Sequence, residues 1–346
     1  MVKGTVVIET PFGRGQIGED MEITRRTLAG LAGHPNVAAA LVLSLSLDSA
    51  EPLAERIRAT GRPVQVLGLQ ESGSALSLTM EGVRLAAEMV IAASHLTREP
   101  APVAALTVGV ECGGSDATSG LASNPAVGRF ADRLVEAGGT IILSEPAEFM
   151  GAEHLLAARA ERAEDAQAIR DMVHRFEEIA LQNGVDMRGT NPTPDNIAGG
   201  LTTLEEKSLG AIAKGGTTPV VETVGYAEPA TRRGLVVMDT PSAACESMTG
   251  LAGGGAQIVI FSTGRGNAIG APIAPTIKVT GNPHTAGGMG ENIDVDVSGI
   301  LTAGLDLEIA GQSVWDKVFQ VAGGVLTSCE VLGEEQLSVS RFGLSV

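Results

Sequence analysis

Short apolar runs alternate with segments of helical periodicity along this chain, and that alternation restricts its fold more than any other feature. Apolar runs of strand length occupy residues 6–8, 37–43, 64–67 and 103–110. Parallel strands joined by crossover helices are the arrangement that such a pattern favours. Because 346 residues exceed one ordinary core, we predict an α/β protein made of two Rossmann-like parallel-sheet domains flanked by helices.

The boundary between the two domains is predicted at a polar segment that holds two prolines, Thr97–Pro102. An N-terminal α/β domain would then cover residues 1–98, and a C-terminal catalytic α/β domain residues 101–346. The clearest helices of the first domain are Asp48–Ala59, with Asp48 as a candidate N-cap, and Ser74–His95. The second of these helices carries one apolar face, made of Leu76, Met80, Val83, Ala87, Val90 and Ile91.

The C-terminal domain shows the same alternation. Strands are predicted at residues 103–110, 140–143, 235–238 and 258–261, and helices at residues 125–137, 162–183 and 314–326. A polar stretch at residues 188–203 is rich in proline and glycine, so we expect a long loop without regular elements there. Long ordered loops are often functional.

The net charge of the chain limits the kinds of molecule that it is expected to bind. Lys and Arg number 24 against 41 Asp and Glu, which gives a net charge of −17, and aromatic residues make up only 3%. An acidic chain with few rings for stacking argues against nucleic acids and anionic membranes as partners, so the expected ligand is small. The start of the chain has no secretion signal. The three cysteines, Cys112, Cys245 and Cys329, are too few for a disulfide framework, so we expect a cytoplasmic location.

Small and polar residues follow directly after the apolar run 103–110. They read ECGGSDATSGLASNP, at one rim of the predicted sheet, where open α/β folds bind ligands. Cys112 could be a metal thiolate, a nucleophile or a small buried hydrophobe; no histidine in the segment would activate it as a nucleophile. We predict a substrate pocket whose lining from this segment comprises Cys112, Gly113, Gly114, Ser115 and Asn124.

Carboxylates and a histidine follow the predicted strand 140–143, in the sequence SEPAEFMGAEH. Glu145 and His154 are candidate metal ligands, because carboxylate oxygen and imidazole nitrogen suit iron, manganese or calcium. His154 could also serve as a base. The alternative is that Glu148 and Glu153 are solvated residues of a first helical turn and that His154 lies at the surface.

Positive groups stand among glycine-rich loops of this acidic chain, namely Lys207, Lys214, Arg265 and Lys278. An anionic substrate would need such groups, and arginine binds carboxylates through its planar fork. Lys207 could instead be surface charge beside Glu205 and Glu206. We predict that Thr263 and Arg265, from STGRG, and Lys278 contact the substrate.

The segment GRGQIG, Gly13–Gly18, formally matches the dinucleotide-binding fingerprint. The acidic residue that should bind the ribose about twenty positions later is missing, since no acid precedes Asp48 in that region. A glycine-rich connecting turn is the simpler interpretation, and an NAD-dependent oxidoreductase is the weaker hypothesis.

Several long stretches of residues 103–301 resemble the large catalytic portion of the altronate and galactarate dehydratase family, which the large subunit of (2R)-sulfolactate sulfo-lyase shares. The matching stretches occur in family order and include ECGGSDATSGLASNPAVG, GGLTTLEEKSLGAIAKGGTTPV, VVMDTPS and TGLAGGGAQIVIFSTGRGNAIGAPIAPTIKVTGN.

The resemblance implies a carbon–oxygen lyase that removes the proton beside the carboxylate of a sugar acid and expels the β-hydroxyl as water, giving a 2-keto-3-deoxy acid. It implies a divalent metal, Fe2+ in the first place and Mn2+ or Ca2+ as alternatives. We place Asp116, Glu145 and His154 near metal or proton transfer, Arg265 on a substrate carboxylate, and Lys207 as an auxiliary cation or base.

The resemblance also leaves alternatives. The family's small N-terminal domain and its arginine-rich opening segment have no counterpart in the sequence, so a separate small-domain subunit is an expected partner, together with a homo-oligomer. The other interpretations are a sulfo-lyase large subunit that releases sulfite and a non-catalytic binding subunit.

Overall fold

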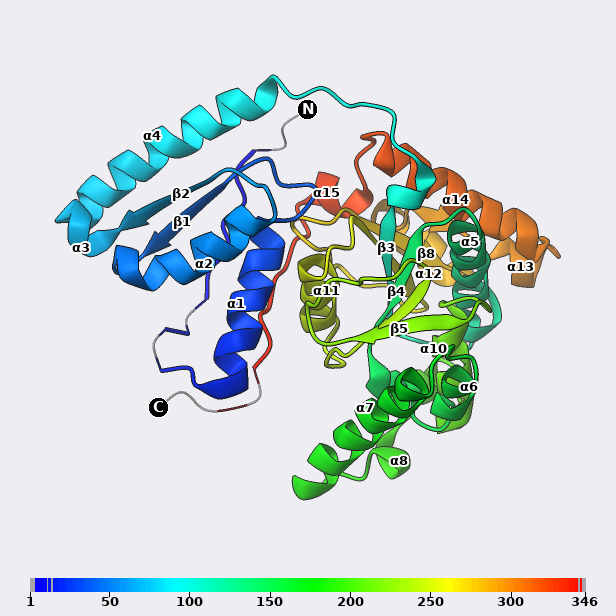
Figure 1. The fold of residues 1–346 in the computed structure, drawn as a ribbon. Coiled ribbons are helices and arrows are strands. Elements are labelled where there is room, and N and C mark those ends of the chain that lie inside the picture. The colour runs from blue at the N-terminus through cyan, green and yellow to red at the C-terminus, as the bar shows by residue number, and fades with distance from the viewer. Residues whose placement is uncertain (1–3, 11, 14, 342, 344–346) are drawn as a thin grey trace.

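A computed structural model describes residues 4–10, 12–13, 15–341 and 343, and a seven-stranded sheet forms its largest part (Figure 1). The strand order is β5-β6-β4-β3-β7-β8-β9, and every neighbouring pair is parallel. The carboxyl ends of all its strands therefore lie at one edge. The strands are β3 (Thr107–Gly113), β4 (Thr140–Leu143), β5 (Val220–Val224), β6 (Leu235–Met238), β7 (Ile258–Thr263), β8 (Thr276–Thr280) and β9 (Val295–Asp296).

Both faces of this sheet are covered, which explains why its central strands are continuous apolar runs. One face, with Val110 and Leu143, packs on α5 (Asn124–Glu136), α7 (Ala163–Gln182) and α14 (Leu307–Ala322). The other face, with Ile142 and Phe261, packs on α11 (Ala244–Gly253). The remaining helical elements here are η1 (Val103–Ala105), η2 (Ser119–Ser123), η3 (Pro146–Phe149), α6 (Glu153–Ala158), α8 (Met187–Thr190), α9 (Pro194–Ala198), α10 (Leu204–Ala213), α12 (Pro283–Gly288), η4 (Gly290–Asn292), α13 (Gly299–Thr302) and α15 (Ser328–Leu332).

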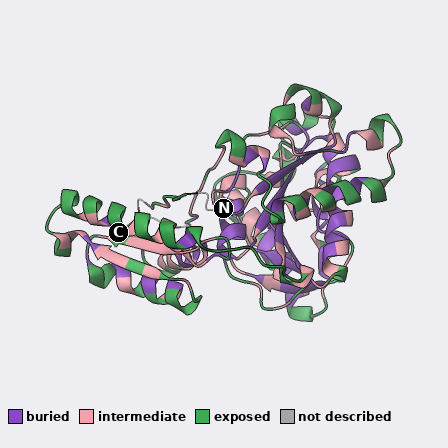
Figure 2. Cartoon of the chain, turned by 90° about the horizontal axis from the view of Figure 1, so that it is seen from above, coloured by how far each residue is buried: buried purple, intermediate pink, exposed green. Residues whose placement is uncertain are grey.

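The N-terminal part holds a second, two-stranded parallel sheet of β1 (Ala40–Ser44) and β2 (Val64–Gly68). Helices α2 (Leu47–Ala59), α3 (Leu69–Ser72) and α4 (Ala75–Ser94) accompany this sheet. Figure 2 shows that its strands are only partly buried and that much of its helical surface is exposed. The apolar face that the sequence predicted for α4 points outward, because the helix packs on the sheet through the opposite side, at Gly82.

The helix α1 (Gly18–Ala32) and the turn after it connect the two parts. α1 packs against α11 so closely that a Cβ atom at Gly30 would collide with the carbonyl oxygen of Gly253. His34, which is 1% exposed, places Nε2 3.0 Å from the carbonyl oxygen of Ala256. The two parts are thus joined by a buried contact as well as by the chain.

The predicted α/β class, with parallel sheets flanked by helices, is confirmed. Three strands, β5, β8 and β9, were not predicted, and two short helices, α8 and α9, interrupt the stretch expected to be a loop. The predicted strand at residues 6–8 is wrong, since that segment pairs with no strand of the described chain. GRGQIG consequently lacks the preceding strand that a dinucleotide site requires; its Arg14 lies outside the described residues. None of the described helices is both long and apolar enough to cross a membrane.

Candidate functional site

A group of buried ionisable side chains lies at the carboxyl edge of the large sheet, at the ends of β3 and β4. Glu111 and Cys112 belong to the last residues of β3 and are 0% and 2% exposed. Glu145 lies two residues after the end of β4, and Glu148 lies in η3 just beyond it. Three carboxyl groups and one thiol therefore converge where two adjacent strands end.

Lys214 supplies the positive charge of this group. It is the residue that ends α10, and it is 0% exposed. Its Nζ lies 3.2 Å from Cys112 Sγ and 3.6 Å from Glu148 Oε2, while Cys112 Sγ donates to Glu148 Oε2 over 3.2 Å. A fully buried lysine is costly unless it is paired, so its presence here requires the surrounding carboxylates.

The protonation states follow from burial and from these neighbours. Burial raises the pKa of Cys112 to about 12, so the side chain is a thiol. Burial and the adjacent Glu111 raise the pKa of Glu145 well above its usual value. Burial opposes the charged form of Lys214, but the groups around it outweigh this effect and raise its pKa. The lysine is an ammonium ion, and its charge is fixed at any physiological pH.

Two carboxyl groups of the site form a hydrogen-bonded pair, Glu111 with Glu145. Glu111 also accepts hydrogen bonds from Ser144 Oγ (2.7 Å) and Ser247 Oγ (2.5 Å). Glu145 has the left-handed backbone angle φ = 61°, which is uncommon for a residue other than glycine. Its Oε1 is buried and has no hydrogen-bond partner in the described chain. Strained backbone and an unpartnered oxygen are typical of functional sites.

Glu148 and Lys207 are the members of the group that reach solvent. Their side chains are 12% and 13% exposed, and Lys207 Nζ lies 3.8 Å from Glu148 Oε1. Lys207 Nζ also donates to Asn191 Oδ1 over 3.0 Å. Asn124 lies on the buried side of the group. Its Nδ2 donates to the carbonyl oxygen of Gly210, and its Oδ1 is buried without a partner in the described residues. Of the two lysines beside Glu148, Lys207 is the one nearer to solvent.

The glycine-rich segment after β3 leads to a second, adjoining group around Asp116. Asp116 is 2% exposed; it accepts from Thr118 Oγ1 (2.6 Å) and Ser119 N (3.0 Å) through Oδ1, and from Asn282 Nδ2 (2.7 Å) through Oδ2. Ser115 accepts from Asn196 through its carbonyl oxygen, and Thr263 Oγ1 accepts from Gly266 N. Both oxygens of Asp116 are occupied in holding loops together.

Other predicted site residues lie outside the buried group. Gly113 ends β3 with Phe261 packed against it, and Gly114 has φ = 61°, which turns the chain toward Thr263. Arg265 is exposed, and its Nη1 donates to the carbonyl oxygen of Asp195. Lys278 is 0% exposed but donates to the carbonyl oxygen of Asn267 over 2.5 Å and faces Glu334 at 3.5 Å, so it fastens the C-terminal segment.

His154 is not brought to the buried group. It lies exposed on α6 and has no hydrogen bond or ion pair within the described part of the chain. Among the described residues, no three His, Cys, Asp or Glu side chains are arranged to hold a metal ion. The ammonium of Lys214 lies 3.2 Å from the thiol of Cys112 and 3.6 Å from the carboxylate of Glu148, where a metal would compete with it. The described donor set does not fit the expected metal, and we derive no chemical step through one.

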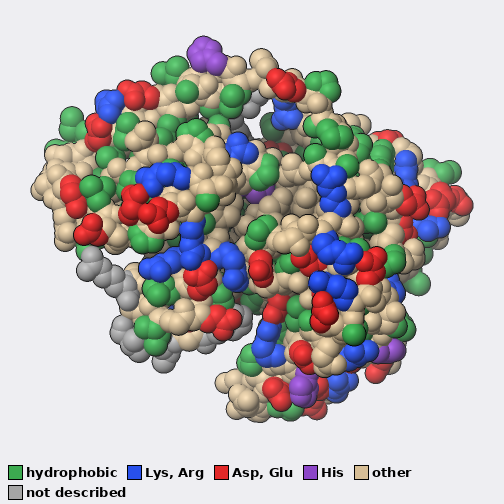
Figure 3. Space-filling model, viewed as in Figure 1, with side chains coloured by type: hydrophobic (Ala, Val, Ile, Leu, Met, Phe, Trp, Pro, Cys, Tyr) green, Lys and Arg blue, Asp and Glu red, His purple; other side chains and the backbone are tan. Residues whose placement is uncertain are grey.

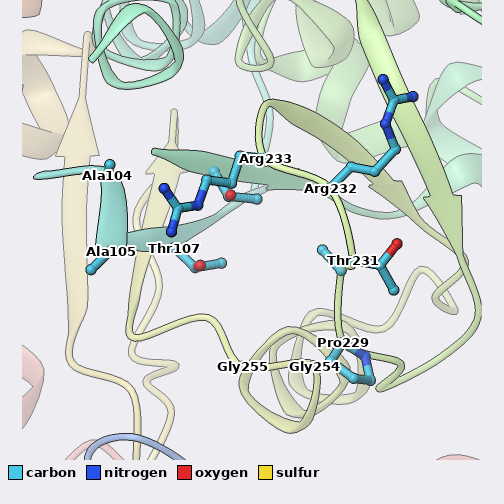
Figure 4. A pocket seen from close by; sticks show the side chains of 11 residues that line it. Ala104, Ala105, Thr107, Pro229, Thr231, Arg232, Arg233, Gly254 and Gly255 are labelled. Atoms are coloured by element: carbon cyan, nitrogen blue, oxygen red, sulfur yellow. The ribbon is translucent and has the colours of Figure 1, made fainter. Parts of the chain in front are cut away.

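A cavity of about 340 Å³ lies at the opposite edge of the sheet, where β3 and β4 begin. Its lining includes Thr107, Thr140, Arg232, Arg233, Gly254 and Gly255. Figure 4 shows Arg233 reaching toward Thr107, while Arg232 points away; the latter pairs with Glu161. This cavity contains none of the predicted site residues, and ligand sites of open α/β sheets lie at the carboxyl edge, so the buried group is the candidate site.

Comparison with known sequences identifies the family of the chain. Residues 103–345 match the sequence model described as D-galactarate/Altronate dehydratase, C-terminal, and residues 1–94 match D-galactarate dehydratase/Altronate hydrolase, second domain. The chain belongs to the galactarate and altronate dehydratase family. The predicted family resemblance is thereby confirmed, and Glu111, Cys112, Glu145, Glu148, Lys207 and Lys214 all lie inside the C-terminal match.

Individual members of the family resemble the chain to different degrees. The (2R)-sulfolactate sulfo-lyase subunit beta of Chromohalobacter salexigens is 40% identical over 98% of this chain and 88% of its own length. Altronate dehydratase of Bacillus subtilis is 32% identical over 99% of the chain and 68% of its own length. Galactarate dehydratase (L-threo-forming) of Escherichia coli is 33% identical over 86% of the chain and 59% of its own length.

Sequence reasoning missed the roles of Glu111 and Lys214 in the site. Glu111 was read only as the start of a polar segment, and Lys214 as one of several positive groups. A signal existed in both cases, because each charged residue adjoins a run of apolar residues, VAALTVGV before Glu111 and GAIA before Lys214. A charge at the end of an apolar element is buried when that element is buried, and it then requires a partner.

Proposed function

We propose that this protein catalyses β-elimination from a small hydroxy acid, with dehydration of a sugar acid to a 2-keto-3-deoxy acid as the principal reaction. Membership of the dehydratase family supports the reaction class. The observation that carries the assignment of the site is the buried Lys214 ammonium among Glu111, Glu145 and Glu148 at the carboxyl edge of the sheet.

The arrangement suits the first step of such an elimination. Loss of the proton beside a carboxylate leaves an enediolate, whose added negative charge must be stabilised by fixed positive groups. Glu148, which reaches solvent beside Lys207, is the candidate base that takes this proton. Lys207 is the candidate partner of the substrate carboxylate, and Lys214 supplies a second positive charge that needs no reorganisation.

The second step breaks the carbon–oxygen bond. The electron pair of the enediolate forms the carbon–carbon double bond, and the β-hydroxyl leaves with a proton as water. The enol product then takes up a proton at the former β-carbon and becomes the 2-keto-3-deoxy acid. Atoms and charge balance without an oxidant or reductant, in agreement with the weak match of GRGQIG to a dinucleotide site.

Substitution of the candidate base tests this proposal. With a panel of aldonates and aldarates, Glu148→Gln is expected to lower kcat by about 10²–10⁴-fold, which is the usual contribution of a positioned base. Glu164→Gln is the matched control, because Glu164 is 73% exposed on α7 and, among the described residues, forms an ion pair with Arg162 alone. Unchanged turnover in Glu148→Gln would contradict the assignment of the base. No 2-keto product from any acid, even with a small partner subunit, would contradict the reaction.

A sulfo-lyase reaction is the second candidate, and a specific observation favours it. The sulfo-lyase subunit beta shares 40% identity and is covered over 88% of its length, against 32% and 68% for an altronate dehydratase. The same site would then expel sulfite in place of water. Incubation with (2R)-sulfolactate, with and without a small partner subunit, separates the two reactions, since only the sulfo-lyase releases sulfite. Ligand binding without turnover under all conditions would indicate a non-catalytic subunit.

The family resemblance alone supports a divalent metal, with Fe2+ as the first choice and Mn2+ or Ca2+ as alternatives, because the described side chains form no metal site. Activity of chelator-treated protein, before and after anaerobic addition of each metal, measures the requirement. Full activity after complete metal removal would contradict it.

A further inference from the structure

The cavity at the amino edge of the large sheet has a polar floor on a face that is otherwise apolar. Thr107 and Thr140 begin the adjacent strands β3 and β4 and are direct neighbours in their register. Side chains two positions apart share a face of a strand, so Thr140 lies on the same face as Ile142, which packs on α11. The end of α11 and the loop 229–233 enclose the space above this floor. Its volume of about 340 Å³ is that of a site for a small molecule.

The hydroxyl groups of this floor are not used in holding the fold together. Thr140 is only 5% exposed, and neither its hydroxyl nor that of Thr107 forms a hydrogen bond with any residue that the structure describes. By contrast, the hydroxyls of Thr223 and Thr231 on neighbouring segments donate to carboxylates. A buried hydroxyl without a partner costs free energy unless another molecule supplies one. The two threonines therefore leave two donors for a ligand in the cavity.

Arg233 adds a positive charge to the cavity. Figure 4 shows its side chain reaching toward Thr107, and it forms neither a hydrogen bond nor an ion pair within the described ranges of the chain. The carboxylates near the loop are taken, because Glu222 accepts from the loop backbone and Glu161 pairs with Arg232. Over much of the face shown in Figure 3, positive side chains lie beside negative ones. In a chain with a net charge of −17, Arg233 is thus a cation that remains available to an external anion.

We propose that this cavity is a second binding site, which takes a small monocarboxylate with an oxygen on the carbon beside the acid group. Guanidinium binds a carboxylate through two parallel hydrogen bonds, which assigns the acid group to Arg233. The hydroxyls of Thr107 and Thr140 then donate to the neighbouring oxygen. The side chains of the remaining wall are apolar: Ala104, Ala105, Pro229 and Ala230. One unpaired cation and an apolar wall suit a single acid group on a short chain.

The proposed site is distinct from the buried ionisable group. Thr107 precedes Cys112 by five residues in β3, which separates the two by about 16 Å along the strand. A molecule of this size cannot contact both ends of the strand. The bound carboxylate is therefore no reactant, and it stabilises the folded chain because it binds the folded form alone. The inference is independent of the reaction assigned above.

Calorimetric titration of the full-length protein with lactate and with propionate tests the proposal. Lactate is expected to bind saturably, one molecule per chain, and more tightly than propionate, which lacks the hydroxyl. Arg233→Gln should weaken lactate at least about tenfold through loss of the charged hydrogen bonds. Thr140→Val keeps the shape of the floor and should abolish the preference for lactate. Arg170→Gln is the control, since Arg170 is exposed on α7 and bonds to the carbonyl oxygen of Ala166.

A variant of the candidate reaction site locates the bound carboxylate. Lys207→Gln should bind lactate as the wild type does, and circular dichroism confirms that each variant is folded. Lost binding in Lys207→Gln together with unchanged binding in Arg233→Gln would place the carboxylate at the reaction site and overturn the proposal. So would the absence of saturable binding up to about 10 mM lactate. Tighter binding of inorganic phosphate than of lactate would overturn the assignment to a monocarboxylate.

Discussion

The two sheets of this protein are built from similar short parallel strands but differ in how they are buried. In the seven-stranded sheet, Ile142, Leu143, Val236 and Val237 are all 0% exposed, because helices cover both faces. In the two-stranded sheet, β1 has no fully buried residue and Leu43 is 54% exposed. The large sheet is complete within one chain, whereas the small one leaves apolar surface on its strands and on α4.

The difference in burial gives the side chains of the two parts different surroundings. Complete burial around the large sheet gives the low-dielectric surroundings in which Lys214 and its carboxylates interact strongly. Incomplete burial around the small sheet gives a surface suited to another molecule. The two parts thus share a class of fold but differ in how far their side chains are removed from solvent.

The largest effect is expected from removal of the buried cation. Lys214→Met leaves the two buried carboxyl groups, Glu111 and Glu145, without their positive neighbour, so we expect loss of activity and a decrease of about 3–5 kcal/mol in the free energy of unfolding. The decrease should be smaller at acidic pH, where protonation of Glu111 and Glu145 removes the charge that Lys214 offsets. Urea unfolding at two pH values measures it, with Lys317→Met, whose side chain is 20% exposed, as the control. Equal stability of Lys214→Met and the wild type would mean that the cluster is not held by charge.

A matched pair of leucines compares the two sheets directly. Leu143→Ala in β4 removes a fully buried side chain and should cost about 2–5 kcal/mol through lost burial and a cavity. Leu43→Ala in β1 removes a side chain that is 54% exposed and should cost less than about 1 kcal/mol in the isolated chain. Thermal or urea unfolding of both variants measures the contrast. Similar costs would show that the small sheet is more completely buried than the structure indicates.

The buried contact between the two parts should make stability depend on pH. Burial lowers the pKa of His34 to about 4 from 6.5. Below pH 6.5 the unfolded chain takes up a proton that the folded chain excludes, so stability is full above pH 6.5 and falls as the pH approaches 4. The loss at pH 5 is about 2 kcal/mol relative to pH 7.5. His34→Gln should flatten this part of the profile; an unchanged slope would assign it to other groups.

Particular strands and residues show which parts of the structure could be predicted from the sequence. The alternation of short strands and helices predicted β4 and β6 with their observed bounds. The strands β5 and β8 were not predicted because threonine, lysine and glutamate interrupt their apolar residues, and burial of those polar side chains depends on partners elsewhere. The strand β9 has only two residues, too few for a periodic pattern. His154 looked like a ligand from its neighbours in sequence, yet α6 turns it to solvent.

The sequence by itself determined the α/β class and the family, because local periodicity and motifs are properties of neighbouring residues. Only the tertiary structure decided which charged groups meet there. Lys214 reaches Cys112 across 102 positions, and Ser247 reaches Glu111 across 136. Such pairings follow from the order of strands in the sheet, which local periodicity does not encode. The outward face of α4 was decided in the same way, since the helix is apolar on two sides and only its packing shows which side is left open.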